Sequence, residues 1–174
     1  GVLGRALGTF FAQNGAKRIA LGYDARESST RFCEILTAGL TSRGCDVVLI
    51  GMVPTPVLYH TVYTLEVDGG VMITGSHNPP DHNGFKICLG RATLFGPQIQ
   101  EIREIAERAE RHLVDDSAIG EVTRIDVIDD YVDDIVSRID LGPRKLKAVI
   151  DGGNGMGGVT AGPVYEKLGV KLVK

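Results

Sequence analysis

The sequence predicts an α/β fold, with a three-layer α/β/α domain around a mixed, mostly parallel sheet and the start of a second, similar domain. Short apolar runs alternate with segments of helical periodicity, and the links between them are short. One tight reversal joins two neighbouring apolar runs, which favours an antiparallel pair within the sheet. The 174 residues suffice for one domain of ordinary size and part of another.

The first domain is expected to alternate helices and strands from its first residues. Its expected strands are short apolar runs bounded by polar or turn residues, as in strands buried on both faces; they span residues 17–24, 45–52, 69–74 and 84–90. Its expected helices repeat apolar residues at helical spacing; they span residues 3–11, 28–43, 55–65 and 97–113.

Capping residues predict where two of these helices begin. Ser28 or Ser29 is expected to N-cap the second helix, which Gly44 then stops. Thr55 followed by Pro56 matches an N-cap and the first helical position of the third helix.

The reversal "NPPDHNG" is short enough to make the fourth strand antiparallel to the third. The sheet is therefore expected to be mixed. The fourth helix should pack one apolar face on this sheet and leave its charged face in solvent. Its apolar positions are Ile99, Ile102, Ile105, Ala106, Ala109 and Leu113.

Periodicity is lost from Val114 to Asp126, which is the expected domain boundary. Residues 1–126 would form the first domain, and residues 127–174 part of the second. The second part is expected to contain a helix, a strand entering a glycine-rich loop, a helix and the start of another strand. These elements correspond to residues 129–139, 144–158, 162–169 and 170–174.

Composition argues against several classes of protein. The net charge is -3, and Lys and Arg are scattered, so we expect no nucleic-acid partner. No apolar run approaches the roughly 20 residues needed to span a bilayer, and no signal-peptide pattern opens the chain. Cys33, Cys45 and Cys88 lack metal-site spacing and are expected to be reduced thiols of a cytoplasmic protein.

The stretch "VMITGSHNPPDHNGFKI" (residues 71–87) combines several chemical functions. Turn-forming residues explain its middle part, but they do not explain "TGSH" or Lys86. Ser76 follows a glycine at the carboxyl end of a buried strand, where open α/β sheets bind ligands. A ligand-binding site is therefore expected around Ser76.

Four residues are candidate catalytic residues, beginning with Ser76 itself. Gly75 leaves space beside Ser76 for a phosphorylated group. His77 can exchange a proton near neutral pH, and Lys86 can supply a positive charge to phosphate. Arg26 follows the first strand and could reach the same sheet edge. The G-x-S-x-G hydrolase motif and the P-loop motif are both missing from the sequence.

The stretch "GNGMGG" at residues 153–158 matches the G-x-G-x-x-G pattern of dinucleotide-binding loops. That fingerprint also needs an acidic residue about 20 positions later, whereas the next one here is Glu166, inside an expected helix. We therefore expect the glycines to serve a tight turn and close helix packing. The aspartates of the preceding helix are expected to be surface residues rather than metal ligands; they are Asp129, Asp130, Asp133 and Asp134.

Four stretches of this sequence together resemble the α-D-phosphohexomutase family. The family's phosphoserine loop is similar to "TGSHNPPDHNGFKI", and its G-x-D-x-R-x-S segment to "GYDARESS". Its linker into the next helix is similar to "GMVPTPVLYH", and the opening of its second domain to "VIDGGNGMGG". The resemblance therefore covers nearly the whole chain.

The resemblance implies a phosphomannomutase/phosphoglucomutase, which interconverts hexose 1-phosphate and hexose 6-phosphate through a 1,6-bisphosphate. Ser76 would be the phosphorylated nucleophile and, through its phosphate, one ligand of Mg²⁺. His77, Lys86 and Arg26 would lie around the transferring phosphoryl group. The implied partners are a hexose phosphate substrate and glucose 1,6-bisphosphate as activator.

Proteins of this family have four domains, and these residues match the first and part of the second. The family's D-x-D-x-D-R metal loop, sugar-specificity loop and C-terminal phosphate-binding loop have no match in the sequence. We therefore expect an N-terminal fragment that is inactive alone. The alternative is a non-catalytic phosphosugar- or dinucleotide-binding module, and the preferred hexose and the oligomeric state stay open.

Overall fold

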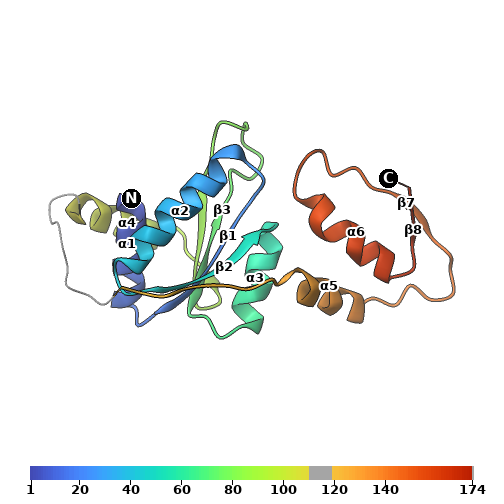
Figure 1. The fold of residues 1–174 in the computed structure, drawn as a ribbon, viewed down its shortest axis with the longest axis horizontal. Coiled ribbons are helices and arrows are strands. Elements are labelled where there is room, and N and C mark those ends of the chain that lie inside the picture. The colour runs from blue at the N-terminus through green and yellow to red at the C-terminus, as the bar shows by residue number, and fades with distance from the viewer. Residues whose placement is uncertain (110–118, 174) are drawn as a thin grey trace.

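The computed structural model describes residues 1–109 and 119–173, which form two sheets flanked by helices (Figure 1). The larger sheet contains β1 (Arg18–Tyr23), β2 (Asp46–Met52), β3 (Gly69–Ile73), β4 (Phe85–Leu89), β5 (Ala92–Thr93) and β6 (Val122–Arg124). Its helices are α1 (Val2–Gln13), α2 (Glu27–Thr41), α3 (Thr55–Thr64) and α4 (Pro97–Ala109). The smaller unit contains α5 (Ile128–Ser137), β7 (Lys147–Val149), α6 (Gly157–Lys167) and β8 (Lys171–Val173).

The larger sheet has the strand order β5-β4-β3-β1-β2-β6. Neighbouring strands among β1, β2, β3 and β6 are parallel, whereas β4 is antiparallel to β3 and β5 to β4. The expected mixed, mostly parallel sheet is therefore confirmed. The expectation missed β5 and β6, which are two and three residues long, too short to show alternation.

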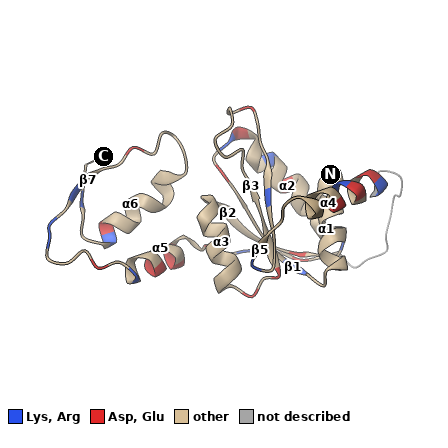
Figure 2. Cartoon of the chain, turned by 180° about the vertical axis from the view of Figure 1, so that it is seen from behind, with Lys and Arg blue, Asp and Glu red and all other residues tan. Residues whose placement is uncertain are grey.

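Helix α4 has the two faces that its sequence predicts. Ile102 and Ile105 are buried, while the charged side chains form exposed pairs four residues apart, such as Arg103 with Glu107. Figure 2 shows acidic and basic residues along α4. Ile99 is 37% exposed, so it contributes less to the buried face than expected. The expected position Leu113 lies outside the described residues.

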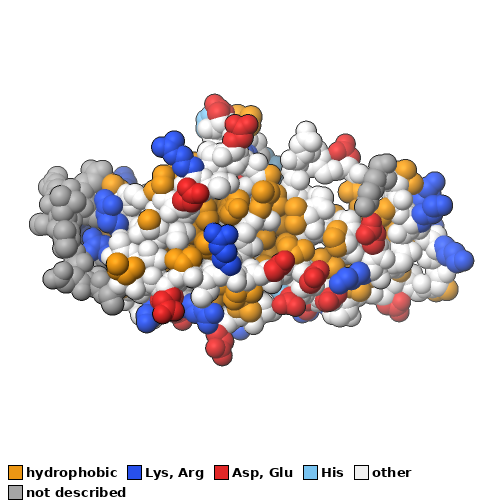
Figure 3. Space-filling view, in the orientation of Figure 1, with side chains coloured by type: hydrophobic (Ala, Val, Ile, Leu, Met, Phe, Trp, Pro, Cys, Tyr) orange, Lys and Arg blue, Asp and Glu red, His pale blue; other side chains and the backbone are white. Residues whose placement is uncertain are grey.

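One face of the larger sheet is covered by helices only as far as α2. Beyond α2, a groove of about 870 Å³ runs over β2 and β6, and Met52 and Val122 beside it are each about half exposed. Figure 3 shows apolar side chains gathered in the middle of this face. Among the described strands, β6 is the edge on this side.

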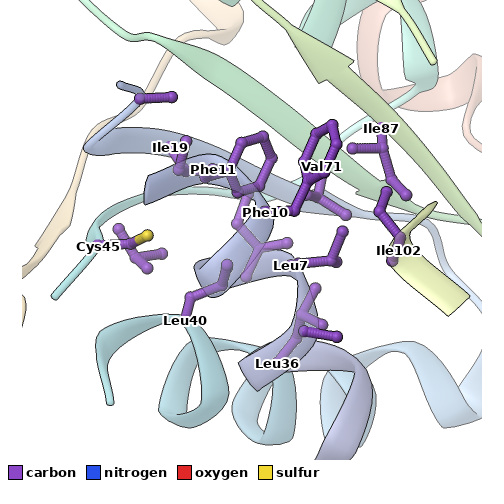
Figure 4. Close-up of a cluster of buried hydrophobic side chains, with 14 of the residues drawn as sticks. Leu7, Phe10, Phe11, Ile19, Leu36, Leu40, Cys45, Val71, Ile87 and Ile102 are labelled. Carbon is purple, nitrogen blue, oxygen red and sulfur yellow. The ribbon is translucent and has the colours of Figure 1, made fainter. Parts of the chain in front are cut away.

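The core has two parts because side chains alternate between the faces of each strand. Ile19, Leu21, Val71 and Ile73 face α1, α2 and α4, and Figure 4 shows part of this cluster. Neighbouring positions face α3 and the start of α5 instead; they are Ala20, Val48, Ile50 and Met72. The three layers predicted from the sequence are therefore present.

Three helix starts differ from the expectations. Helix α2 begins at Glu27 without a side-chain cap, because the Ser29 hydroxyl donates to Asp24 instead of capping the helix. Helix α3 begins at Thr55, one residue early, with Pro54 at the capping position. Helix α6 begins at Gly157 rather than Gly162 and therefore contains Pro163 in its interior. The expected cap at Ser28 or Ser29, the expected cap at Thr55 and the later start of α6 were wrong.

The three cysteines are free and buried, as expected for reduced thiols. Burial, and then the nearby charge of Asp46, raises the pKa of the Cys45 thiol to about 11. At neutral pH this thiol is therefore protonated and unreactive. None of the described helices is long and apolar enough to cross a membrane.

Candidate active site

A cleft of about 1000 Å³ lies at the carboxyl edge of the larger sheet. Its walls are the segments that follow β1, β2 and β3, and residues 153–156 before α6. All four predicted catalytic residues line it: Arg26, Ser76, His77 and Lys86. The structure thus brings residues from β1–α2 and β3–β4 to one place.

The topology of the sheet explains this convergence. Strands β1, β2 and β3 are parallel, so their carboxyl ends meet at the same edge. Helix α2, which follows β1, packs on one face of the sheet, and α3, which follows β2, packs on the other. Open α/β sheets bind ligands where the direction of the connections reverses in this way.

Ser76 is exposed in the cleft and has a left-handed backbone, with a φ of 54°. This conformation costs a residue with a side chain about 1–2 kcal/mol, so the surroundings must hold it. The Ser76 amide donates to Thr74 Oγ1 at 3.0 Å. The Ser76 hydroxyl lies 3.2 Å from His77 Nδ1, so an unprotonated imidazole can accept its proton.

Lys86 reaches the cleft from β4. It is the register partner of Met72 on β3, so both residues are on the face of the sheet that α3 covers. Among the described residues, none forms a hydrogen bond or ion pair with the Lys86 side chain, although the Lys86 backbone belongs to the β3–β4 pairing. Its ammonium group is therefore available to an anion in the cleft.

Arg26 lies behind the loop that carries Ser76, which we call the Ser76 loop (residues 74–84). Its Nε donates to Asp24, and its two terminal nitrogens donate to four backbone carbonyls of the loop. These carbonyls belong to Ser76, Asn78, Pro79 and His82. Because a guanidinium has five N–H donors, all the donors of Arg26 are used within the protein.

Asp24 connects Arg26 to the start of the Ser76 loop. Its side chain is 12% exposed, and burial by itself would raise its pKa. Hydrogen bonds from Ser29 and Thr74, together with the backbone and the charge of Arg26, outweigh burial and lower the pKa of Asp24. The Asp24 carboxylate is therefore charged at neutral pH and binds both Arg26 and Thr74.

Gly75 is required by the close approach of Arg26 to the loop. A Cβ at this position would lie 2.6 Å from Arg26 Cζ and 2.7 Å from the His82 carbonyl oxygen. The sequence suggested a different reason, space for a phosphorylated group. The structure adds the packing of the guanidinium against the loop backbone.

Residues 151–156, which we call the glycine loop, also belong to the cleft. Gly153 and Asn154 have left-handed backbones, and a Cβ on Gly152 would lie 3.3 Å from the Gly158 amide nitrogen. The glycines therefore do serve a tight turn, as expected. Sequence reasoning did not foresee that residues 153–156 line the cleft with Ser76.

Thr55 and Tyr59 of α3 line the cleft as well, and sequence reasoning missed them. A signal for them was available. The Thr55-Pro56 pair follows β2 directly, so its place at the carboxyl edge of a parallel sheet could have been inferred.

The aspartates of α5 were expected to be surface residues; Asp129, Asp130 and Asp133 are exposed, and Asp133 and Asp134 also form ion pairs. Asp134 pairs with Arg138 and with His60 of α3, and Asp133 pairs with Lys167 of α6. The hydrogen bond from Arg138 is the main reason why the pKa of Asp134 is lowered. Within the described residues, no three Asp, Glu, His or Cys side chains are placed to hold a metal ion.

Comparisons with known proteins give the family. A family model described as phosphoglucomutase/phosphomannomutase, alpha/beta/alpha domain I, matches residues 2–112. A phosphoglucomutase of Neisseria meningitidis is 45% identical over 173 residues, which cover 99% of this chain and 37% of that protein. A phosphomannomutase/phosphoglucomutase of Pseudomonas aeruginosa is 41% identical over 171 residues, covering 98% of this chain and 36% of that protein.

A solved structure gives the same result. The crystal structure of a phosphoglucomutase/phosphomannomutase family protein from Burkholderia thailandensis matches with a TM-score of 0.89 and 38% identity, covering 99% of this chain and 38% of that one. The chain belongs to the phosphoglucomutase/phosphomannomutase family, as its motifs predict. It spans a little over one third of the length of these relatives.

Proposed function

We propose that this chain is the phosphoserine-bearing part of a phosphohexomutase that interconverts hexose 1-phosphate and hexose 6-phosphate. One observation carries the proposal: Ser76 is exposed in a cleft with a histidine nitrogen 3.2 Å from its hydroxyl and an unpaired lysine, Lys86, among the described lining residues. Family membership supports the same activity. The cleft volume of about 1000 Å³ is sufficient for a hexose bisphosphate.

In the proposed reaction, phosphorylated Ser76 gives its phosphoryl group to a free hydroxyl of the hexose phosphate. The bond between phosphorus and Ser76 Oγ breaks, a bond to the sugar oxygen forms, and the proton of the sugar hydroxyl passes to Ser76 Oγ, which becomes a hydroxyl again. The bisphosphate product then turns over and returns its other phosphate to Ser76 Oγ. The bond between that phosphorus and the sugar oxygen breaks, and the serine proton passes to the sugar oxygen. The sugar thereby exchanges one phosphate position for the other, and the enzyme is restored.

His77 and Lys86 have distinct roles in this proposal. His77 Nδ1 lies within hydrogen-bond distance of Ser76 Oγ, so it can accept the serine proton and return it. Lys86 supplies a positive charge to the phosphoryl oxygens, on which charge is spread in the transition state.

Magnesium is the metal that the family implies, and glucose 1,6-bisphosphate is the implied activator. The phosphate of Ser76 would supply one oxygen ligand, but the described residues contain no group of three acidic or histidine side chains placed for a metal. Mg²⁺ prefers six oxygen ligands, so these residues fit one ligand position and not a complete site. No step proposed for His77 or Lys86 depends on the metal.

The proposal is tested by phosphoryl transfer to the chain. Incubation with labelled glucose 1,6-bisphosphate is expected to label the wild type at Ser76 and to leave Ser76→Ala unlabelled. Labelling is preferable to turnover as a readout, because these 174 residues alone are expected not to interconvert the hexose phosphates. Equal labelling of both proteins would remove Ser76 as the nucleophile, and an unlabelled wild type would overturn the proposal for this chain.

A further inference from the structure

We propose that Arg26 is a positioning residue, which holds the Ser76 loop in the shape that points the Ser76 hydroxyl into the cleft, and that it does not bind the phosphoryl group. The inference rests on the function proposed above, because it concerns the same serine. It differs from the role that the sequence suggested, in which Arg26 lies beside the phosphate.

The hydrogen bonds of Arg26 carry the first step. Four of its five donors bind carbonyls of the Ser76 loop, between 50 and 56 residues away in the sequence. The fifth binds Asp24 Oδ2 at 3.2 Å. The Arg26 side chain is only 13% exposed. A guanidinium in this position has no donor left for a phosphate in the cleft.

The loop backbone depends on these bonds. Within the described part of the chain, Arg26 is the only donor to the carbonyls of Ser76, Asn78 and His82, and only the Pro79 carbonyl has another, the His82 amide at 3.0 Å. Backbone hydrogen bonds inside the loop are few, and Thr74 to Gly84 closes its base at 2.9 Å. Asn83 Nδ2 holds the end of the loop by donating to the Ser28 and Ser29 hydroxyls. Without Arg26, the backbone of the tip would keep two local hydrogen bonds, from Asn78 to Gly75 and from His82 to Pro79.

The conformation of Ser76 gives the second step. Its left-handed backbone is unfavourable for a residue with a side chain, and two side chains hold the polar groups on either side of its Cα. Thr74 Oγ1 accepts from the Ser76 amide at 3.0 Å, and Arg26 Nη2 donates to the Ser76 carbonyl at 3.1 Å. Both side chains also bind Asp24. Asp24, Thr74 and Arg26 together therefore set the backbone of Ser76.

Lysine is not expected to replace Arg26. Its ammonium group has three donors around one atom, whereas the planar guanidinium reaches four carbonyls and Asp24 from three nitrogens. An arginine that acted only through its charge would be replaced in part by lysine. The variant Arg26→Lys therefore distinguishes a positioning role of Arg26 from an effect of its positive charge alone.

The test measures amide hydrogen exchange in residues 75–84 and labelling of Ser76 from glucose 1,6-bisphosphate, in the same set of proteins. Arg26→Lys and Arg26→Ala are expected to speed loop exchange at least tenfold and to slow labelling about 100-fold, the usual cost of a small misplacement of a reacting group. Thr74→Val keeps the charge of Arg26 and is expected to change both readouts in the same direction. Arg31→Ala, which removes an exposed arginine of α2, is the matched control and should change neither.

Two outcomes would overturn the inference. Slow labelling with unchanged loop exchange would mean that Arg26 acts on the phosphoryl group directly. Faster loop exchange with unchanged labelling would mean that the loop shape does not matter for the reaction. If the wild type is not labelled, the function proposed above fails, and unchanged loop exchange in Arg26→Lys and Thr74→Val would then show separately that Arg26 does not hold the loop.

Discussion

The Ser76 loop and the glycine loop line the same cleft, but different parts of the chain hold them. The Ser76 loop is bound by Arg26, more than 50 residues away for most of its partners. The glycine loop is bound by its own residues: Gly153 donates to Asp151 Oδ1 and Gly155 to the Gly152 carbonyl. The first shape therefore requires the folded domain, whereas the second follows from local backbone freedom.

The strands that lead into the two loops differ in burial. Strand β3 leads into the Ser76 loop, and all five of its residues are buried in the middle of the larger sheet. Strand β7 leads toward the glycine loop from a two-stranded sheet, and its Val149 is 77% exposed. The proposed role of Ser76 in phosphoryl transfer would require this residue to be held accurately, which is consistent with its place after a buried strand.

The largest effect is expected from Gly75→Ala, which places a side chain between the Ser76 loop and Arg26. The added Cβ would lie 2.6 Å from Arg26 Cζ, so either the guanidinium or the loop must move. We expect labelling of Ser76 to fall about 100-fold, as for other displacements of a reacting group by about 1 Å. Labelling time courses with glucose 1,6-bisphosphate measure this.

Gly155→Ala is the matched control in the glycine loop. Its added Cβ would lie 3.2 Å from the Gly152 carbonyl oxygen, and Gly155 does not have a left-handed backbone. Labelling should therefore stay within about threefold of the wild type, which corresponds to less than about 1 kcal/mol. Equal losses in both variants would show that the two loops do not differ in the way described.

A smaller effect is expected from Asp24→Asn, and it depends on pH. The pKa of Asp24 is lowered in the folded state, so the charged carboxylate stabilises the folded protein. This contribution to stability is complete above the ordinary aspartate pKa of about 3.9 and is lost as the pH falls through the lowered pKa. At neutral pH the variant loses a charged acceptor, worth about 1.5–3 kcal/mol, and labelling should fall at least about tenfold.

The Ser76 amide resonance reports the same effect without activity. In the wild type it should show a transition below about pH 4, where Asp24 takes up a proton. Asp24→Asn should lack this transition. A transition of equal size in the variant would assign it to another group.

The fold could be predicted well where periodicity was present and poorly where it was not. Strands β1 to β4 and the six helices were expected, since apolar residues repeat along each. Strand β6 was missed because Val122–Arg124 is exposed on both faces, and pairing with β2 leaves no pattern in the sequence. The domain boundary at residue 126 stays a prediction.

The candidate site could be proposed from the sequence where its residues are local in the sequence. Ser76, His77 and Lys86 flank one hairpin turn, so a single motif indicated all three. The partners of Arg26 are backbone carbonyls, which carry no residue identity that a sequence could show. Its arrangement around the loop therefore required the structure. Residues 153–156 were missed because the placement of α5 against α3, and of α6 against α5, depends on long-range pairs such as His60 with Asp134 and Lys167 with Asp133.

A still smaller effect is expected from Gly153→Ala in the glycine loop. Gly153 has a φ of 55° and open space around a Cβ, so the variant has backbone strain but no clash. The expected cost is about 1–2 kcal/mol of unfolding free energy, with labelling of Ser76 unchanged. Thermal unfolding measures the first and the labelling assay the second. A loss of labelling would give the glycine loop a direct part in phosphoryl transfer.

We expect no binding when the chain is titrated with NAD. The glycine loop has the spacing of a dinucleotide-binding turn, but that turn also needs an acidic residue at the end of the next strand to hold the ribose. Residues 168–173, which include β8, contain no Asp or Glu, and Glu166 lies within α6. The loop instead contributes to the cleft that contains Ser76. Calorimetric titration should therefore show no saturable heat with NAD. Micromolar binding that is lost in Gly155→Val would contradict this expectation and would favour a dinucleotide-binding module, because a glycine whose backbone touches the pyrophosphate tolerates no side chain.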